Sequence, residues 1–294
     1  MSKSMMEDMI EKLPHKRVET STSHYDNHRT LTYSGCPVGN IHRIEGKQAE
    51  VEFIRRQEDI RFVMLNIDSA KNMLSAGMDA SHFGPRVRVI TTSTIHDNRL
   101  PYFYTAKEAE VVRNFGPTWH VPCDRPIYSL QEPKERLWYL KNQIESTIEM
   151  KHLLAGTETR MIPLLKWITP DELLLCYDSL VRHEFEEFSY YSVQYFGRSR
   201  GNNRRQLIAD VRQMITLLEI DYLLLIGLQS EALIRYLPKQ VRAYASLNLV
   251  REEFWRQKSS ESSSGGRALS KGRMPHIHNS RLEVLNSQWK GKDW

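Results

Sequence analysis

Cysteine is scarce in this sequence, and no cysteine motif of a metal site occurs. The chain of 294 residues has three cysteines, Cys36, Cys123 and Cys176, which are far apart and form no CxxC pair. A disulfide framework and a cysteine-rich zinc site are therefore disfavoured, and we expect a reducing, cytoplasmic setting. The histidines show no HExxH spacing either, so we expect neither a metal nor a cofactor.

Long apolar runs are missing as well. Residues 1–30 contain no apolar core of the length that a signal peptide has. The longest apolar runs, such as IDYLLLIGL at 220–228, are too short to cross a bilayer. We therefore expect a soluble protein without a membrane partner.

Charge of one sign is only in small excess. Lys and Arg number 41 and Asp and Glu 36, which gives a formal net charge of +5 and a pI of about 9.0. This excess permits an anionic partner but does not require one.

Two enzyme signatures are also absent. No GxGxxG follows a predicted strand, which weakens a dinucleotide-binding interpretation, and no GxSxG supports a serine hydrolase.

What is present is a patterned centre between two polar segments. Residues 1–48 are rich in Ser, Thr, His and charge, and residues 257–294 begin with a Ser/Gly/basic low-complexity stretch. Between them, residues 49–256 contain eight short runs rich in Val, Ile, Tyr and Phe that are typical of strands. The runs are 51–54, 61–66, 86–92, 118–122, 160–166, 188–196, 221–227 and 241–245.

Helical stretches separate many of these runs. Thr105 is the expected N-cap of one helix, Pro133 starts a second over 133–154, and Thr169 caps a third. Strands that alternate with helices predict an α/β fold with parallel strands. Eight strands suit a closed (β/α)8 TIM-type barrel with polar N- and C-terminal extensions, and an open doubly wound sheet is the alternative. In a barrel, functional residues lie on the loops that follow the strands.

Two of these loops offer groups that can recognise a base. In VPCDRPIY at 121–128, Asp124 can accept two hydrogen bonds from the amino and ring N–H groups of a guanine-like base. The alternative is that Asp124 caps a turn or pairs with Arg125. In RMIPLLKWITP at 160–170, Lys166 ends a strand where it can hold a phosphate, and Trp167 can stack on a base. The alternative there is a surface lysine.

Two other loops suggest phosphate binding and catalysis. TTSTIHDN at 91–98 supplies His96 and Asp97, each a candidate for a catalytic role. YFGRSRGNNRR at 195–205 is the best phosphate-binding candidate, because a glycine-bearing loop with guanidinium groups leads into a helix N-terminus. The alternative is a solvated basic loop. The arginines are Arg198, Arg200, Arg204 and Arg205.

Four segments, taken in order, resemble the tRNA-guanine transglycosylase superfamily, closest to its DpdA-type branch, which inserts deazapurines into DNA. They are VPCDRPIY, IPLLKWITPDELLLCYDSL, YYSVQYFGRSRGNNRRQLIADV and DYLLLIGLQSEALIRYLPKQVRAYAS. The resemblance implies a barrel that acts on DNA or tRNA, in which an Asp attacks the ribose anomeric carbon, guanine leaves and a deazaguanine-type base enters. The target nucleotide must be turned out of its stack for this chemistry.

The resemblance also implies roles for particular residues. Base binding would fall to Asp124, Lys166, Gln194 and Gly197, and phosphate binding to the four arginines of 195–205. The family's early aspartate falls within TTSTI at 91–95, and its nucleophilic aspartate falls at Ala245 or Ser246, so neither position carries a carboxylate. The catalytic candidates are therefore Asp97 and Ser246.

Two functions of different classes follow from these replacements. The first is a pentosyltransferase that exchanges a purine-type base in nucleic acid. The second is a catalytically degenerate barrel that binds nucleic acid or a partner enzyme, and a homodimer is also open. A third option is a barrel enzyme with a small phosphorylated substrate. A carboxylate within reach of a sugar in the pocket distinguishes the enzyme from the binding protein.

Overall fold

The computed structural model describes residues 36–196, 203–228 and 231–246. The chain divides into two units, Met1–Cys36 and Pro37–Trp294, and all described helices and strands belong to the second. The described strands are β1 (Gly39–Arg43), β2 (Phe62–Asn66), β3 (Arg88–Thr92), β4 (Trp119–Val121), β5 (Arg160–Met161), β6 (Leu164–Leu165), β7 (Phe188–Tyr191), β8 (Leu223–Leu228) and β9 (Val241–Ser246).

Six α-helices are described between these strands. They are α2 (Gln48–Arg56), α3 (Ile67–Ser75), α4 (Thr105–Phe115), α5 (Pro133–Leu153), α6 (Pro170–Val181) and α7 (Arg204–Leu217). Short 3-10 helices form η1 (Ala80–Phe83), η2 (Asp97–Tyr102), η3 (Val193–Phe196) and η4 (Glu231–Tyr236). The alternation of strands and helices predicted from the sequence is thereby confirmed.

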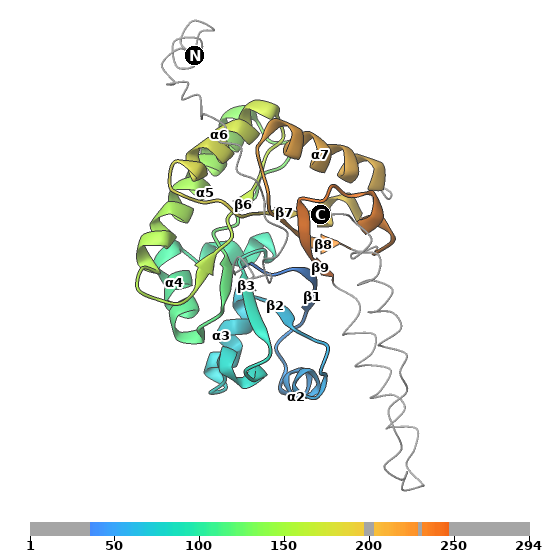
Figure 1. Cartoon of the computed structure of the whole chain (residues 1–294). Coiled ribbons are helices and arrows are strands. Elements are labelled where there is room, and N and C mark those ends of the chain that lie inside the picture. The colour runs from blue at the N-terminus through green and yellow to red at the C-terminus, as the bar shows by residue number, and fades with distance from the viewer. Residues whose placement is uncertain (1–35, 197–202, 229–230, 247–294) are drawn as a thin grey trace, which may run out of the picture. The chain divides into compact units, whose positions relative to one another are not determined.

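The nine strands form one curled sheet in which every pairing is parallel. The order is β5-β4-β3-β2-β1-β9-β8-β7-β6, so the first strand lies in the middle and pairs with both β2 and β9. The helices lie around the outside of the strands (Figure 1). Because every strand runs the same way, all carboxyl ends and the loops after them lie at one edge of the sheet.

The two ends of this strand order are neighbours in the sequence. Only Ile162 and Pro163 separate β5 from β6, where the sequence predicted a single strand over 160–166. The Ile162 amide donates to the His120 carbonyl on the β4 side at 2.9 Å, and the Ser189 amide of β7 donates to the Pro163 carbonyl at 2.8 Å. Pro163 has no amide hydrogen, so it interrupts the ladder at this point.

Successive side chains along a strand alternate between the side of the sheet that faces the helices and the opposite side. In β2, Val63 and Leu65 belong to the apolar cluster that also contains residues of α2, α3 and α4, while Met64 between them faces the opposite way. A second cluster contains residues of α5, α6 and α7 with Leu223 and Leu225 of β8. We call the face turned away from the helices the inner face of the sheet.

Several predicted boundaries are confirmed and others need correction. Helix α5 begins at Pro133, and Thr169 is the N-cap of α6, where its side chain accepts from the Glu172 amide at 3.4 Å. Thr105 is the first residue of α4 rather than its N-cap, which is Tyr104. Strand β1 lies inside the segment 1–48 that was predicted as a polar extension, because GNIHR has a single apolar residue and gives no strand pattern. Residues 257–294 lie outside the described part.

Two kinds of feature are missing from the described part of the chain. None of its helices is long and apolar enough to cross a membrane. Within the same residues, no group of three or more His, Cys, Asp or Glu side chains is placed to hold a metal ion.

Candidate functional site

A pocket of about 300 Å³ lies at the carboxyl edge of the sheet. Its walls come from the ends of four strands and the loops after them, namely β3, β4, β6 and β7. The polar side chains that line it are those of His96, Asp97, Asp124, Tyr128, Lys166, Trp167, Tyr190 and Tyr191. The segments 91–98, 121–128 and 160–170, which the sequence singled out separately, therefore meet at one site.

Asp124 lies deep in this pocket. Its side chain is buried, and the Lys166 ammonium forms an ion pair with its Oδ1. Burial raises the pKa of Asp124 above its usual value, and the charge of Lys166 opposes that rise. The carboxylate is thus held beside the Lys166 ammonium in a site where burial makes its charged form less favourable.

The Arg125 guanidinium is not the partner of this carboxylate. Its guanidinium turns toward α5, where it donates to Asn142 at 2.7 Å and to Ser146 at 3.1 Å. Its remaining hydrogen bond is to the backbone carbonyl of Asp124 at 3.0 Å. Lys166 in turn donates to the backbone carbonyl of Arg125. The lysine therefore points into the pocket and is not a surface lysine.

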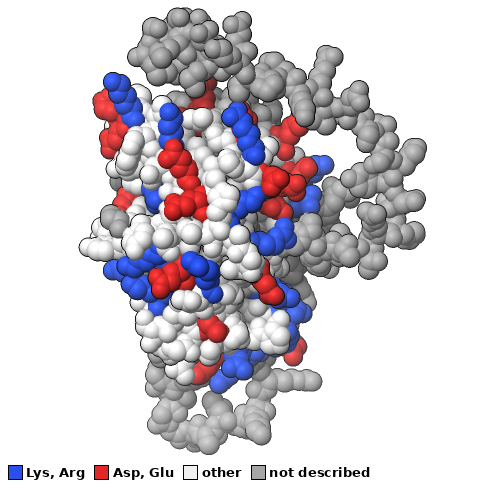
Figure 2. All heavy atoms as spheres, turned by 90° about the vertical axis from the view of Figure 1, so that its left-hand side faces the viewer, with Lys and Arg blue, Asp and Glu red and all other residues white. Residues whose placement is uncertain are grey.

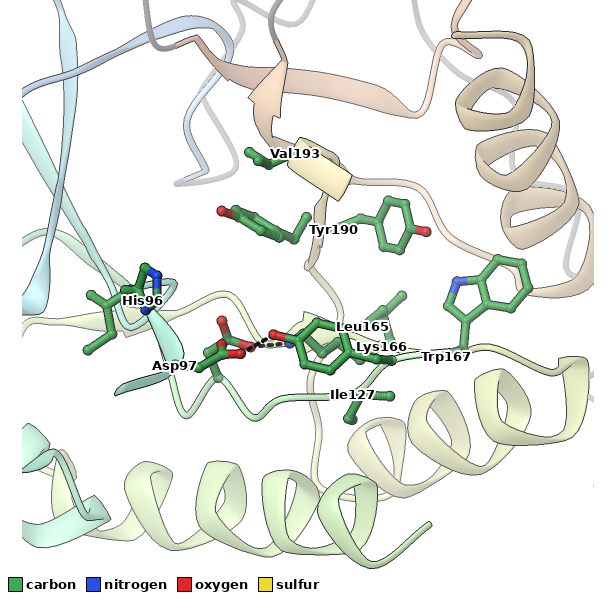
Figure 3. Close-up of a pocket in the computed structure, with 12 residues that line it drawn as sticks. His96, Asp97, Ile127, Leu165, Lys166, Trp167, Tyr190 and Val193 are labelled. Carbon is green, nitrogen blue, oxygen red and sulfur yellow. Dashed lines mark hydrogen bonds and ion pairs between the residues drawn. The ribbon is translucent and has the colours of Figure 1, made fainter. Parts of the chain in front are cut away.

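Asp97 lies at the rim of the same pocket. It is exposed and accepts a hydrogen bond from the Tyr128 hydroxyl (Figure 3). Burial raises the pKa of Tyr128, and the hydrogen bond to Asp97 adds to that rise, so the phenol stays protonated. The negative charge of Asp97 also raises the pKa of Asp124. Two carboxylates thus share one pocket, one exposed at its rim and one buried.

The turn that carries Asp124 is fixed by hydrogen bonds from neighbouring elements. The Asp124 amide donates to the Ser93 hydroxyl at 2.9 Å, and the Cys123 amide donates to Oε1 of Glu108 at 3.1 Å. Cys123 has a positive φ of 57°, which is unusual for a residue with a side chain. Two successive amides are therefore bound by side chains that come from the β3 loop and from α4.

Glu108 belongs to a network that is completely buried. The same Oε1 lies 2.8 Å from Nε2 of His120, and Nδ1 of His120 lies 2.9 Å from the Thr91 hydroxyl. All three side chains are at most 1% exposed. Sequence reasoning missed these residues, because the three lie in separate elements and only the packing of α4 on β3 and β4 joins them.

Aromatic side chains form the other walls. Trp167 lies at one end of the pocket in Figure 3, and its buried indole N–H has no hydrogen-bond acceptor among the described residues. Tyr190 also lines the pocket, and its hydroxyl lies 2.5 Å from that of Tyr195, which donates to Asp210 of α7 at 2.5 Å. The pocket therefore combines aromatic surfaces with an indole N–H that no described acceptor satisfies.

The remaining predicted site residues are distributed as follows. Ser246 ends β9 in register with His42 and Leu228 and does not line the pocket. Gln194 lies in η3 beside the pocket residue Val193, but its side chain is outside the described part, as are Gly197, Arg198 and Arg200. Arg204 and Arg205 are exposed in the first turn of α7.

Comparison with known proteins adds no assignment to this geometry. No protein-family model matches the chain, and no curated protein matches it. The functional argument therefore rests on the pocket and on the chemistry of its residues.

Proposed function

We propose that this protein binds a purine-type base of nucleic acid in the pocket and exchanges it as a pentosyltransferase of the guanine transglycosylase type. We also propose that the sheet is a closed (β/α)8 barrel, in which β5 and β6 are two halves of one strand. The hydrogen bonds on both sides of Pro163 support this closure, because they link the segment to β4 and to β7. Counting that segment once leaves eight strands.

The observation that carries the proposal is the meeting of Asp97, Asp124 and Lys166 in one pocket. A volume of about 300 Å³ is at the lower end of the range for small-molecule sites, which suits a base or a nucleoside. The exposed Asp97 is placed at the rim, where the sugar of a flipped nucleotide would lie. The buried Asp124 is placed deeper, where the base would lie.

The polar groups of the pocket match the edge of guanine. The Asp124 carboxylate, held by Lys166, can accept from the ring N–H or the amino group, and the indole N–H of Trp167 can donate to the carbonyl oxygen. A site whose buried polar groups are satisfied only by the ligand rejects analogues that lack those groups. Guanine and 7-deazaguanine present the same polar edge, so both fit this pattern.

In the exchange reaction, the Asp97 carboxylate attacks the anomeric carbon of the ribose and the bond from that carbon to the base breaks. The departing base keeps the electron pair of that bond and takes a proton from the Lys166 ammonium, which lies beside Asp124 in the pocket. The incoming base then gives its ring N–H proton to the Lys166 amine, its nitrogen attacks the anomeric carbon, and the ester bond to Asp97 breaks, which restores the carboxylate. Asp97 takes this role rather than Ser246, because Asp97 lines the pocket.

Contacts with the nucleic-acid backbone would come from beside the pocket. Arg204 and Arg205 are exposed at the start of α7, and α7 follows η3, which contributes Val193 to the pocket wall. The face on which α4 and α5 lie carries charges of both signs side by side (Figure 2). Such a mixed surface is poorly suited to a phosphate backbone.

A binding protein without catalysis is the second candidate. It is favoured by the absence of a carboxylate at positions 245–246. The hydrogen bond that the Tyr128 hydroxyl donates to Asp97 also favours it, because it makes the Asp97 carboxylate less available as a nucleophile. The two candidates share the base-binding pocket and differ in whether Asp97 reacts.

One experiment separates them. Binding of guanine and 7-deazaguanine is measured by calorimetry, and incorporation of labelled guanine is measured in tRNA and in duplex DNA. We expect Asp97→Asn to abolish incorporation and retain binding, and Asp124→Asn to weaken binding about tenfold or more. Asp221→Asn is the matched control, because Asp221 is exposed just before β8, at the opposite edge of the sheet.

The outcomes are distinct. Binding without incorporation by the natural protein selects the second candidate. Failure of both bases to bind, or an Asp124→Asn variant that binds them as well as the natural protein, rejects both candidates.

A further inference from the structure

Arg43 is a cation that the proposed reaction does not use. It is the last residue of β1, so it lies at the carboxyl edge of the sheet with the pocket loops. It pairs in register with Met64 of β2, whose neighbours Val63 and Leu65 face the helices. Alternation along the strand therefore directs the Arg43 side chain to the inner face.

Tyr191 is the described partner of this guanidinium. The guanidinium and the phenol lie close enough for each to shift the pKa of the other, and burial lowers the pKa of Arg43. Tyr191 ends β7, lines the pocket, and is close enough to Asp97 and Asp124 for their charges to raise its pKa. Arg43 thus lies on the inner face next to the pocket, and the Tyr191 ring lies between the guanidinium and the pocket.

No carboxylate neutralises Arg43 in the described part of the chain. Each ion pair found there joins other residues. Of the two pocket carboxylates, Asp124 is paired with Lys166 and Asp97 accepts from Tyr128. The Arg43 side chain is part-buried, and a guanidinium that is partly withdrawn from water favours an anion beside it.

We propose that Arg43, oriented by Tyr191, forms an oxyanion subsite that binds the phosphate group of the nucleotide whose base enters the pocket. This inference rests on the proposed function and names its substrate as a phosphorylated nucleotide rather than a free base or nucleoside. A guanidinium presents two parallel N–H groups that match two oxygens of a phosphate. The phosphate supplies the negative charge that none of the described carboxylates provides beside Arg43.

Calorimetry with guanosine, GMP and inorganic phosphate tests this subsite. We expect GMP to bind about tenfold or more tightly than guanosine, and inorganic phosphate to compete with GMP but not with guanosine. Arg43→Gln should remove the difference between GMP and guanosine and leave guanosine binding unchanged. Arg88→Gln is the control, because Arg88 is exposed at the amino end of β3.

Two further variants test the subsite if Arg43→Gln does not fold. Arg43→Lys keeps the charge and should retain part of the preference for GMP, and Tyr191→Phe should reduce it several-fold by removing the hydroxyl that orients the guanidinium. A short guanine-containing oligonucleotide shows whether the phosphate comes from a strand. If that oligonucleotide competes with GMP and its binding depends equally on Arg43, the bound phosphate belongs to a nucleic acid. If the oligonucleotide does not compete, the bound phosphate belongs to a free nucleotide.

Failure of this inference differs from failure of the proposed function. Equal affinities of the natural protein for guanosine and GMP overturn the subsite, while binding of both that depends on Asp124 leaves the base pocket intact. Binding of inorganic phosphate that depends on Arg43, without binding of guanosine, supports the phosphate subsite and rejects the proposed base pocket.

Discussion

Replacing Glu108 by alanine tests the network that fixes the turn before Asp124. Oε1 of Glu108 accepts from the Cys123 amide at 3.1 Å and lies 2.8 Å from Nε2 of His120. The alanine side chain provides no acceptor, and Glu108 and His120 are at most 1% exposed, so the two donors lie away from bulk water. Both donors are then left buried without a partner.

The expected loss follows from these two donors. Each unsatisfied buried donor costs about 1–3 kcal/mol, so Glu108→Ala should lower the free energy of unfolding by about 2–6 kcal/mol. Glu108→Gln keeps an acceptor oxygen and loses the charge, so its loss should be about 1 kcal/mol. Glu110→Ala is the control on the same helix, because Glu110 is exposed and should change stability by less than about 0.5 kcal/mol.

Chemical unfolding of the three variants measures these differences, with guanine binding measured alongside. A change of 1 kcal/mol corresponds to roughly 2–4 °C in melting temperature for a domain of this size. Base affinity should fall in Glu108→Ala, because the freed Cys123 amide no longer fixes the turn that carries Asp124. If Glu108→Ala unfolds at the same denaturant concentration as Glu110→Ala, the network does not have the stabilising role assigned to it.

Two further predictions concern the pocket. Burial raises the pKa of Asp124 above the ordinary 3.8, so the folded protein holds this proton more tightly than the unfolded chain does. The natural protein should therefore lose stability relative to Asp124→Asn as the pH rises from 3.8 through the raised value, and parallel unfolding curves across pH would contradict this. Gly227 has a φ of +85°, and an added Cβ would lie 2.1 Å from a methyl group of Val193, so Gly227→Ala should destabilise the protein and displace this pocket residue. Gly77→Ala is its control, because Gly77 has a φ of +74° with open space around it, and equal melting temperatures of the two variants would refute the clash.

The sequence by itself determined the order of strands and helices and the loops that carry the site. Val, Ile, Tyr and Phe runs alternate with helix starts such as Pro133 and Thr169, and these signals depend on neighbouring residues only. Because parallel strands place their carboxyl ends together, the loops with Asp97, Asp124 and Lys166 were recognisable as functional candidates. The weak pattern of β1 hid both that strand and Arg43.

The tertiary structure alone decided which of these groups meet. Lys166 pairs with Asp124 rather than lying on the surface, although Arg125 is the nearer neighbour of Asp124 in the chain and turns to α5. The sheet brings together the loop of Lys166 and the loop of Arg125, which are 41 residues apart along the chain. Ser246 and Asp97 were equal candidates in the sequence, and only the fold shows that Asp97 lines the pocket and Ser246 does not. Ion pairs and hydrogen bonds between distant segments depend on strand register and helix packing, and local sequence patterns contain no information on either.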